Sequence, residues 1–160
     1  MIPTQRAAAL ISALVLFLAA AVYLLTLTPT VPFWDSGEFI AVANILGVPH
    51  PPGTPFFVML ARVATLVPWA SIAQRVNALS ALAAALTVWV TYLSTLRLIR
   101  LAQGTERQPW QEWVAIAAAA TGALLLAFSD SFWENSIEAE VYQMMSLAQI
   151  LVFWLGLRWW

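Results

Sequence analysis

Hydrophobic and polar positions are separated into long blocks along this chain. Apolar runs of this length can cross a hydrocarbon core of roughly 30 Å as helices. We expect transmembrane helices near residues 7–28, 72–100, 111–128 and 138–157. Helices are predicted because a chain in lipid must satisfy its backbone hydrogen bonds within the segment.

The segment between the first two runs, residues 29–71, contains two shorter apolar patterns. In DSGEFIAVANIL the apolar residues recur at helical spacing, after Asp35 or Ser36 in a capping position. The pattern PFFVMLARVATLV predicts a second helix over about residues 56–66. Both patterns are too short to span a bilayer, so we expect two interfacial helices. Between them GVPHPPGTP forms a rigid turn, because its prolines fix φ.

The composition supports a membrane protein. The chain is 62% hydrophobic and 9% charged, whereas soluble domains carry about a quarter charged residues. We therefore expect an all-α, polytopic helical membrane protein with lipid as its main surroundings. The absence of cysteine excludes disulfides and cysteine zinc sites. With a net charge of −1 and no lysine, a nucleic-acid partner is not expected.

The distribution of arginines predicts the orientation. Five arginines fall on the side of the amino terminus and two on the other, so the positive-inside rule predicts a cytoplasmic amino terminus. The larger group consists of Arg6, Arg97, Arg100, Arg107 and Arg158, and the smaller of Arg62 and Arg75. Most carboxylates fall opposite, in loops 29–71 and 129–140, which are then extracytoplasmic. Tryptophans at both predicted boundaries, including Trp160 at the inner one, are typical of an aromatic belt.

Two carboxylates of the first loop are candidates for chemistry. Asp35 can serve as a helix N-cap, or as a general base that accepts a proton from an incoming hydroxyl. Glu38 lies one turn later on the same helix face and can interact with the helix N-terminus. Together the pair could bind a cation or share a proton. These alternatives stay open on the residues alone.

Three basic residues on the same side of the membrane are candidates for donor binding. His50 is either a structural residue of the proline turn or a donor to a phosphate leaving group, if the turn brings it back to Asp35. Arg62 and Arg75 either extend toward lipid headgroups or clamp a lipid-linked phosphate, since a guanidinium matches phosphate bidentately.

The second loop, FWENSIEAE, is also acidic. Glu134 and Glu138 are four residues apart and would share a helix face, and Glu134 is read as solvated. Glu140 directly precedes the last apolar run, so it and Tyr142 could line a cavity. We expect the two acidic loops to meet on one membrane face and to form one pocket there.

The motifs WDSGEFIAVANILGVPHPPGTPFF and FWENSIEAEVYQMMSL resemble the amino-terminal module of C-type membrane glycosyltransferases. They are most similar to a protein O-mannosyltransferase-like branch with bacterial members and vertebrate members acting on plexin-type receptors. The resemblance implies inverting transfer of a mannose-like sugar from a polyprenyl-phosphate donor to an acceptor hydroxyl of a protein or glycan. It also implies the extracytoplasmic face and, for a bacterial member, the inner membrane.

The resemblance also implies roles for individual residues. Asp35 would be the base, and His50 would lie near the donor phosphate. Glu38, three residues after Asp35, departs from the adjacent Asp-Glu pair of classical mannosyltransferases, which puts its role in doubt. Glu138 or Glu140 would replace the acidic residue of the second loop, where some C-type enzymes hold a divalent metal.

A second, non-catalytic hypothesis remains open. Family members have many more spans than the four expected here, so the chain is either part of a longer protein or a short subunit of a larger membrane complex. In the second case it would be a transmembrane scaffold. A transporter is disfavoured because no charge falls at the centre of a predicted span.

Overall fold

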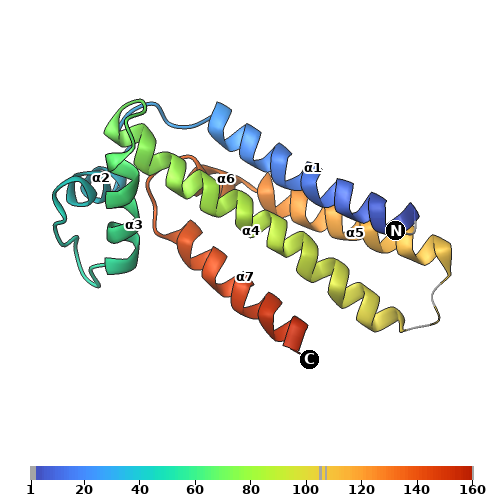
Figure 1. The fold of residues 1–160 in the computed structure, drawn as a ribbon. Coiled ribbons are helices and arrows are strands. Elements are labelled where there is room, and N and C mark those ends of the chain that lie inside the picture. The colour runs from blue at the N-terminus through green and yellow to red at the C-terminus, as the bar shows by residue number, and fades with distance from the viewer. Residues whose placement is uncertain (1–2, 105, 107, 160) are drawn as a thin grey trace.

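The structure, a computed structural model, describes residues 3–104, 106 and 108–159, and this part of the chain is helical without strands. Its helices are α1 (Pro3–Leu25), α2 (Ser36–Ile45), α3 (Pro55–Leu66), α4 (Ile72–Gln103), α5 (Pro109–Ala127), α6 (Asp130–Ser136) and α7 (Tyr142–Trp159). The four long helices form an elongated bundle, and α2 and α3 lie together at one end (Figure 1). The predicted all-α class is confirmed, and α2 and α3 are the two expected short helices.

Three of the long helices, α1, α4 and α5, are long and apolar enough to cross a membrane. α7 is outside this group, since glutamines and Arg158 lower its mean hydropathy, so a crossing by residues 138–157 stays a prediction. α7 begins at Tyr142, after the acidic stretch where its start was expected. The predicted loop 129–140 contains α6, whose seven residues are too few to show an apolar period.

The central helix is α4, which contacts each of the other six described helices. About 67% of its most apolar stretch is buried, against 28% for α1 and for α5, so the outer helices offer most of their surface to lipid. Small side chains let the helices approach closely. On α5 they form one fully buried face of four alanines, Ala115, Ala119, Ala123 and Ala127. The Tyr23 hydroxyl crosses from α1 and donates to the Ala127 carbonyl at 2.8 Å.

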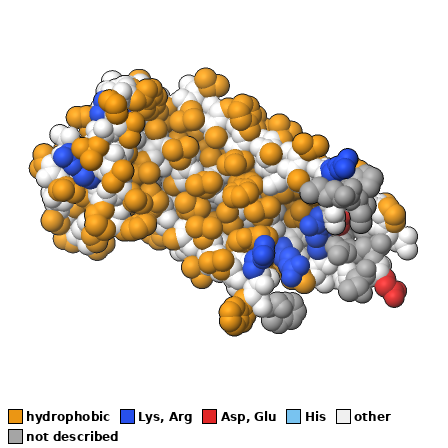
Figure 2. Space-filling model, in the orientation of Figure 1, with side chains coloured by type: hydrophobic (Ala, Val, Ile, Leu, Met, Phe, Trp, Pro, Cys, Tyr) orange, Lys and Arg blue, Asp and Glu red, His pale blue; other side chains and the backbone are white. Residues whose placement is uncertain are grey.

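Exposed apolar side chains cover the visible face along the bundle, and arginines gather at the end away from α2 and α3 (Figure 2). Leu10, Phe17, Leu125 and Val152 are each about 70% exposed. An apolar surface of this extent suits a hydrocarbon environment. The termini lie toward the same end as these arginines (Figure 1). Arg107 and Trp160, which the sequence assigns to that side, lie outside the described residues.

A second, smaller core joins α2 and α3 to the amino-terminal end of α4. It consists of Phe39, Ile40, Ala43, Phe57, Ala61, Ala73, Val76 and Ala139. Ala139 belongs to the segment before α7, so this core brings the two acidic loops against each other. Asn77, fully buried on α4, also donates to the carbonyls of Thr28 at 2.8 Å and Thr30 at 3.3 Å, which fastens the linker before α2.

Candidate functional site

Asp35 occupies the N-cap position of α2, but its side chain makes no capping hydrogen bond. Its backbone is already helical, with φ −75° and ψ −15°, whereas a capping residue usually has extended angles. The preceding Trp34 has φ 64°, in the left-handed region, which turns the chain into α2. The Asp35 side chain remains 60% exposed. The capping interpretation of this side chain is therefore wrong, and the role of base stays a prediction.

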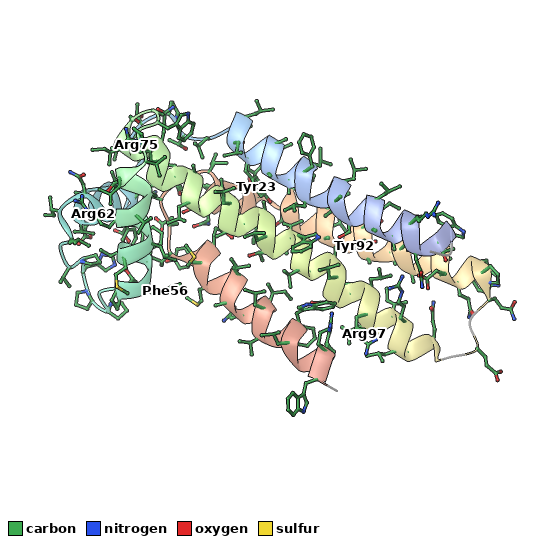
Figure 3. All side chains as sticks on the ribbon, viewed as in Figure 1. Tyr23, Phe56, Arg62, Arg75, Tyr92 and Arg97 are labelled. Atoms are coloured by element: carbon green, nitrogen blue, oxygen red, sulfur yellow. The ribbon has the colours of Figure 1, made fainter. Side chains whose placement is uncertain are left out.

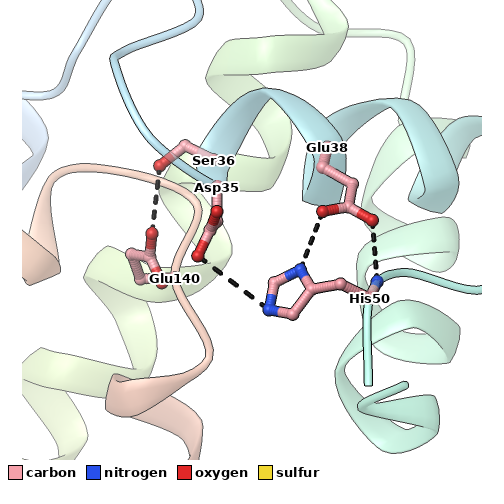
Figure 4. A network of polar contacts seen from close by, with 5 residues as sticks. All are labelled: Asp35, Ser36, Glu38, His50 and Glu140. Atoms are coloured by element: carbon pink, nitrogen blue, oxygen red, sulfur yellow. Dashed lines mark hydrogen bonds and ion pairs between the residues drawn. The ribbon is translucent and has the colours of Figure 1, made fainter. Parts of the chain in front are cut away.

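Glu38 holds His50 by two contacts. Its Oε1 accepts from the backbone amide of His50 at 2.7 Å, and its Oε2 lies 2.8 Å from the ring Nδ1. A carboxylate is an acceptor, so this contact assigns the proton to Nδ1. The other ring nitrogen, Nε2, then faces the Asp35 carboxylate, 3.9 Å from its Oδ2 (Figure 4).

The proline turn places the histidine for these contacts. The amide of Gly53 donates to the His50 carbonyl at 2.9 Å and closes the turn. Gly53 has φ 86°, a conformation that glycine adopts without steric cost. The imidazole also packs against the Phe39 ring, with 5.7 Å between the ring centroids. The prediction that the turn returns His50 to Asp35 is confirmed.

The electrostatics of this trio favour a charged histidine. The hydrogen bond that the His50 ring donates to Glu38 raises the pKa of His50, and the charges of Asp35 and Glu140 add to the shift. The same hydrogen bonds from the His50 ring and amide lower the pKa of Glu38. The ring nitrogen that faces Asp35 is therefore biased toward carrying a proton.

Glu140 comes from the second loop to the cluster formed by Asp35, Glu38 and His50, and it is only 7% exposed. Its Oε1 accepts a hydrogen bond from Ser36 Oγ at 3.3 Å (Figure 4). Ser80 of α4 fixes its backbone, because the Ser80 hydroxyl accepts from the Glu140 amide and donates to the Glu140 carbonyl, both at 3.2 Å. Burial raises the pKa of Glu140, and repulsion from Glu138 and Asp35 raises it further.

The two acidic loops therefore meet, as predicted, although Ser36 and Glu140 are 104 positions apart in the chain. Ser36 and Ser80 make this meeting possible, and no residue pattern indicates their part in it. The pattern around Ser36 indicates a cap alone, and a small polar residue such as Ser80 inside an apolar span does not reveal its partner.

The remaining acidic candidate, Glu138, and Tyr142 each lie two residues from Glu140 in the chain. Glu138 is partly buried, and burial followed by repulsion from Glu134 raises its pKa. Glu134 is exposed, as expected. Tyr142 is 55% exposed at the start of α7. A donor-binding role for Tyr142 stays a prediction.

The arginines of α3 and the start of α4, Arg62 and Arg75, are engaged with main-chain carbonyls. Arg62 donates to the Asn44 carbonyl near the end of α2. Arg75 donates to the carbonyls of Thr65 and Ala70, each at 2.8 Å, and also to that of Trp69. These bonds hold the turn between α3 and α4, so the Arg75 guanidinium has a structural task. Clamping of a phosphate by either arginine stays a prediction.

One group of residues in the described part of the chain could hold a metal ion, namely Asp35, Glu38 and His50, whose ligand atoms lie within 4.8 Å of one another. Carboxylate oxygens with an imidazole nitrogen suit a divalent transition metal. A carboxylate on the far ring nitrogen, as Glu38 provides, is the usual support for a metal-binding histidine. The residues thus fit a divalent cation. The group differs from the expected ligands Glu138 and Glu140, whose metal role stays a prediction.

Comparisons with known proteins agree with the resemblance. Residues 35–160 match the family model described as the Protein O-mannosyl-transferase TMEM260 N-terminal domain. Protein O-mannosyl-transferase TMEM260 of Mus musculus is 36% identical over 140 residues, which cover 87% of this chain and 18% of that protein. The tmem260 protein of Dictyostelium discoideum is 25% identical over 138 residues, covering 84% and 15%.

This chain therefore spans less than a fifth of the length of these two relatives. No solved structure gives a significant match. The family match begins at Asp35 and includes every residue of the cluster. On this match, the chain belongs to the family of the protein O-mannosyl-transferase TMEM260 N-terminal domain.

Proposed function

We propose that the cluster of Asp35, Glu38 and His50 is part of the active site of an inverting glycosyltransferase. The enzyme transfers a mannose-like sugar from a polyprenyl-phosphate donor to an acceptor hydroxyl on the extracytoplasmic face. One observation carries this proposal: an exposed carboxylate that caps no helix lies 3.9 Å from an imidazole held by a second carboxylate. The name of the relatives, protein O-mannosyl-transferase, supports the class of reaction.

Asp35 is the base in this proposal. The acceptor hydroxyl oxygen forms a bond to the anomeric carbon of the donor, and its proton passes to the Asp35 carboxylate. On the opposite side of that carbon the bond to the phosphate oxygen breaks, and polyprenyl phosphate leaves with the electron pair. Attack from the side opposite the leaving group inverts the anomeric configuration.

His50 stabilises the leaving phosphate. Its raised pKa favours the imidazolium form, which donates a charge-assisted hydrogen bond to an anionic oxygen. Glu38 acts as a positioning residue, since its contacts to the amide and Nδ1 of His50 leave Nε2 as the donor. Glu140 is buried against Ser36 and Ser80, so it positions the start of α2 and does not touch substrate.

A divalent cation is an alternative to the protonated imidazole, because a metal ion at Nε2 requires that nitrogen to be without a proton. Asp35 and His50 Nε2 would then hold the cation, and Glu38 would orient the imidazole. When bound, the cation would supply positive charge that stabilises an anionic phosphate. Addition and removal of Mn²⁺ in the transfer assay tests this part separately.

The test replaces Asp35→Asn in the protein expressed at its natural length from its own gene. Transfer from a mannosyl polyprenyl phosphate to acceptor protein is measured in membranes. The expected loss is about 100-fold or more, the usual contribution of a positioned base. The control is Asp130→Asn, which removes an exposed carboxylate from the first turn of α6. Undiminished transfer by Asp35→Asn excludes it as the base, and no transfer by the wild type favours the scaffold hypothesis.

A further inference from the structure

A second charged site lies at the end of the bundle opposite the acidic cluster, between α4 and α7. A cavity of about 410 Å³ opens there, a size typical of small-molecule sites. It is lined by Leu93, Leu96, Arg97, Arg100, Trp154 and Arg158. Arginines gather on this end of the surface in Figure 2, and Arg97 is labelled there in Figure 3.

The site carries excess positive charge. Arg100 is paired with Glu112, whose Oε1 lies 3.0 Å from the Arg100 Nε. Arg158 lies 5.9 Å from the centre of the Trp154 ring, which orders a guanidinium without neutralising it. Within residues 3–104, 106 and 108–159, no carboxylate forms an ion pair with Arg97 or Arg158. Two of the three guanidiniums are therefore available to an anion.

An apolar groove adjoins this cavity. It lies between α1 and α4, has a volume of about 470 Å³, and shares Leu93, Leu96 and Arg100 with the arginine cavity. Three of its polar side chains are bonded within the protein: Trp89 Nε1 donates to Ser12 Oγ at 2.7 Å, and Tyr92 donates to a backbone carbonyl. The groove therefore offers hydrocarbon contact, with a cationic site at one end.

The position of the two cavities indicates their ligand. α1 and α4 are both candidate membrane spans, so lipid chains surround the groove. Arg97 and Arg100 lie in the last two turns of α4, where a span meets the headgroup region. Guanidiniums bind phosphate by paired hydrogen bonds, and basic pockets between transmembrane helices bind anionic lipid headgroups.

We infer that the two cavities together bind one anionic phospholipid, with its phosphate among Arg97, Arg100 and Arg158 and an acyl chain in the groove between α1 and α4. The site is separate from the acidic cluster, so it does not depend on the proposed sugar transfer. The phosphate chemistry is shared with free phosphate, and the groove is what selects the lipid.

The experiment counts lipids bound to the natural-length protein by native mass spectrometry. Phosphatidylglycerol, phosphatidylcholine and inorganic phosphate are the probes. The wild type is expected to retain phosphatidylglycerol in preference to phosphatidylcholine, and millimolar inorganic phosphate is expected not to displace it. Arg97→Gln/Arg158→Gln should weaken phosphatidylglycerol binding roughly 10- to 30-fold, because each basic residue near an anionic lipid contributes about fivefold.

Two controls separate a site from general attraction. Arg6→Gln removes one exposed charge of α1 that lines neither cavity, and it should bind as the wild type. Arg97→Gln alone should bind several-fold more weakly. Arg97→Lys/Arg158→Lys keeps the charge and should recover part of the binding. The inference is overturned if Arg6→Gln and Arg97→Gln act equally, if the wild type does not distinguish the two lipids, or if inorganic phosphate competes fully. The lipid comparison in the wild type decides the matter even if a variant fails to fold.

Discussion

The meeting of the two acidic loops depends on Ser80, and replacing it by alanine tests this dependence. Ser80 is 1% exposed on α4, and its hydroxyl bonds both the amide and the carbonyl of Glu140. Ser94 is a matched control on the same helix, because it is 2% exposed and its hydroxyl has no hydrogen-bond partner among the described residues. Both substitutions remove one buried hydroxyl of the same size.

The two substitutions should change the unfolding free energy differently. Ser80→Ala leaves two buried main-chain groups of Glu140 without the hydroxyl, and an unsatisfied buried group costs about 1–3 kcal/mol. Both bonds measure 3.2 Å, which is the long end of the usual range for the amide donor and beyond it for the hydroxyl donor. We therefore expect a loss of about 1–2 kcal/mol in unfolding free energy. Ser94→Ala removes an unpartnered polar group, so its effect should lie between no change and a gain of about 1 kcal/mol.

The assay is unfolding of the purified protein in mixed micelles, followed by helical circular dichroism during titration with a denaturing detergent. Ser80→Ala should unfold at a lower midpoint than the wild type, and Ser94→Ala at an equal or higher one. Sugar transfer should fall in Ser80→Ala and not in Ser94→Ala, since Glu140 positions the start of α2. Equal destabilisation by the two variants would refute the role of Ser80 as the link between the loops.

Two further predictions concern ionisation. Glu38→Gln should lower the pKa of His50 more than Asp35→Asn does, because the hydrogen bond to Glu38 is the largest cause of the raised pKa. His50 is the single histidine of the chain, so NMR of ¹⁵N-histidine-labelled protein in chelator-containing buffer measures its pKa directly. The contribution of His50 to stability is complete below its unfolded pKa and is lost as the pH rises through its raised folded pKa. The contribution of Glu38 is lost as the pH falls through its lowered folded pKa. A pH profile of stability that is unchanged in Glu38→Gln would contradict the pairing of the two residues. For Glu140 burial raises the folded pKa, so stability decreases as the pH rises through it, and Glu140→Gln should reduce this decrease while its amide oxygen keeps the Ser36 bond. The test compares the unfolding free energy of the wild type and of Glu140→Gln at about pH 5 and pH 8. A steeper loss of stability toward pH 8 in Glu140→Gln would count against the burial argument.

Much of the fold could be predicted from residue patterns. Long apolar runs indicate helices over α1, α4 and α5, and the short amphipathic patterns predict α2 and α3 to within about a residue at either end. α6 was missed because seven residues hold too few apolar positions to show a period. The turn around His50 was predictable because prolines and Gly53 restrict the backbone locally.

Local patterns along the chain specify the helices, the proline turn and the residue types capable of chemistry, because these follow from local backbone preferences and from the cost of polar groups in lipid. Which of those residues work together depends on the tertiary fold. The fold places Glu38 in contact with His50 and leaves the Asp35 side chain without a capping hydrogen bond. It also brings Glu140 to Ser36, with Ser80 holding the Glu140 backbone. It also engaged Arg62 and Arg75 with carbonyls. Such pairings depend on how α4 packs against its neighbours, and distances between segments far apart in the chain are not encoded in any local pattern.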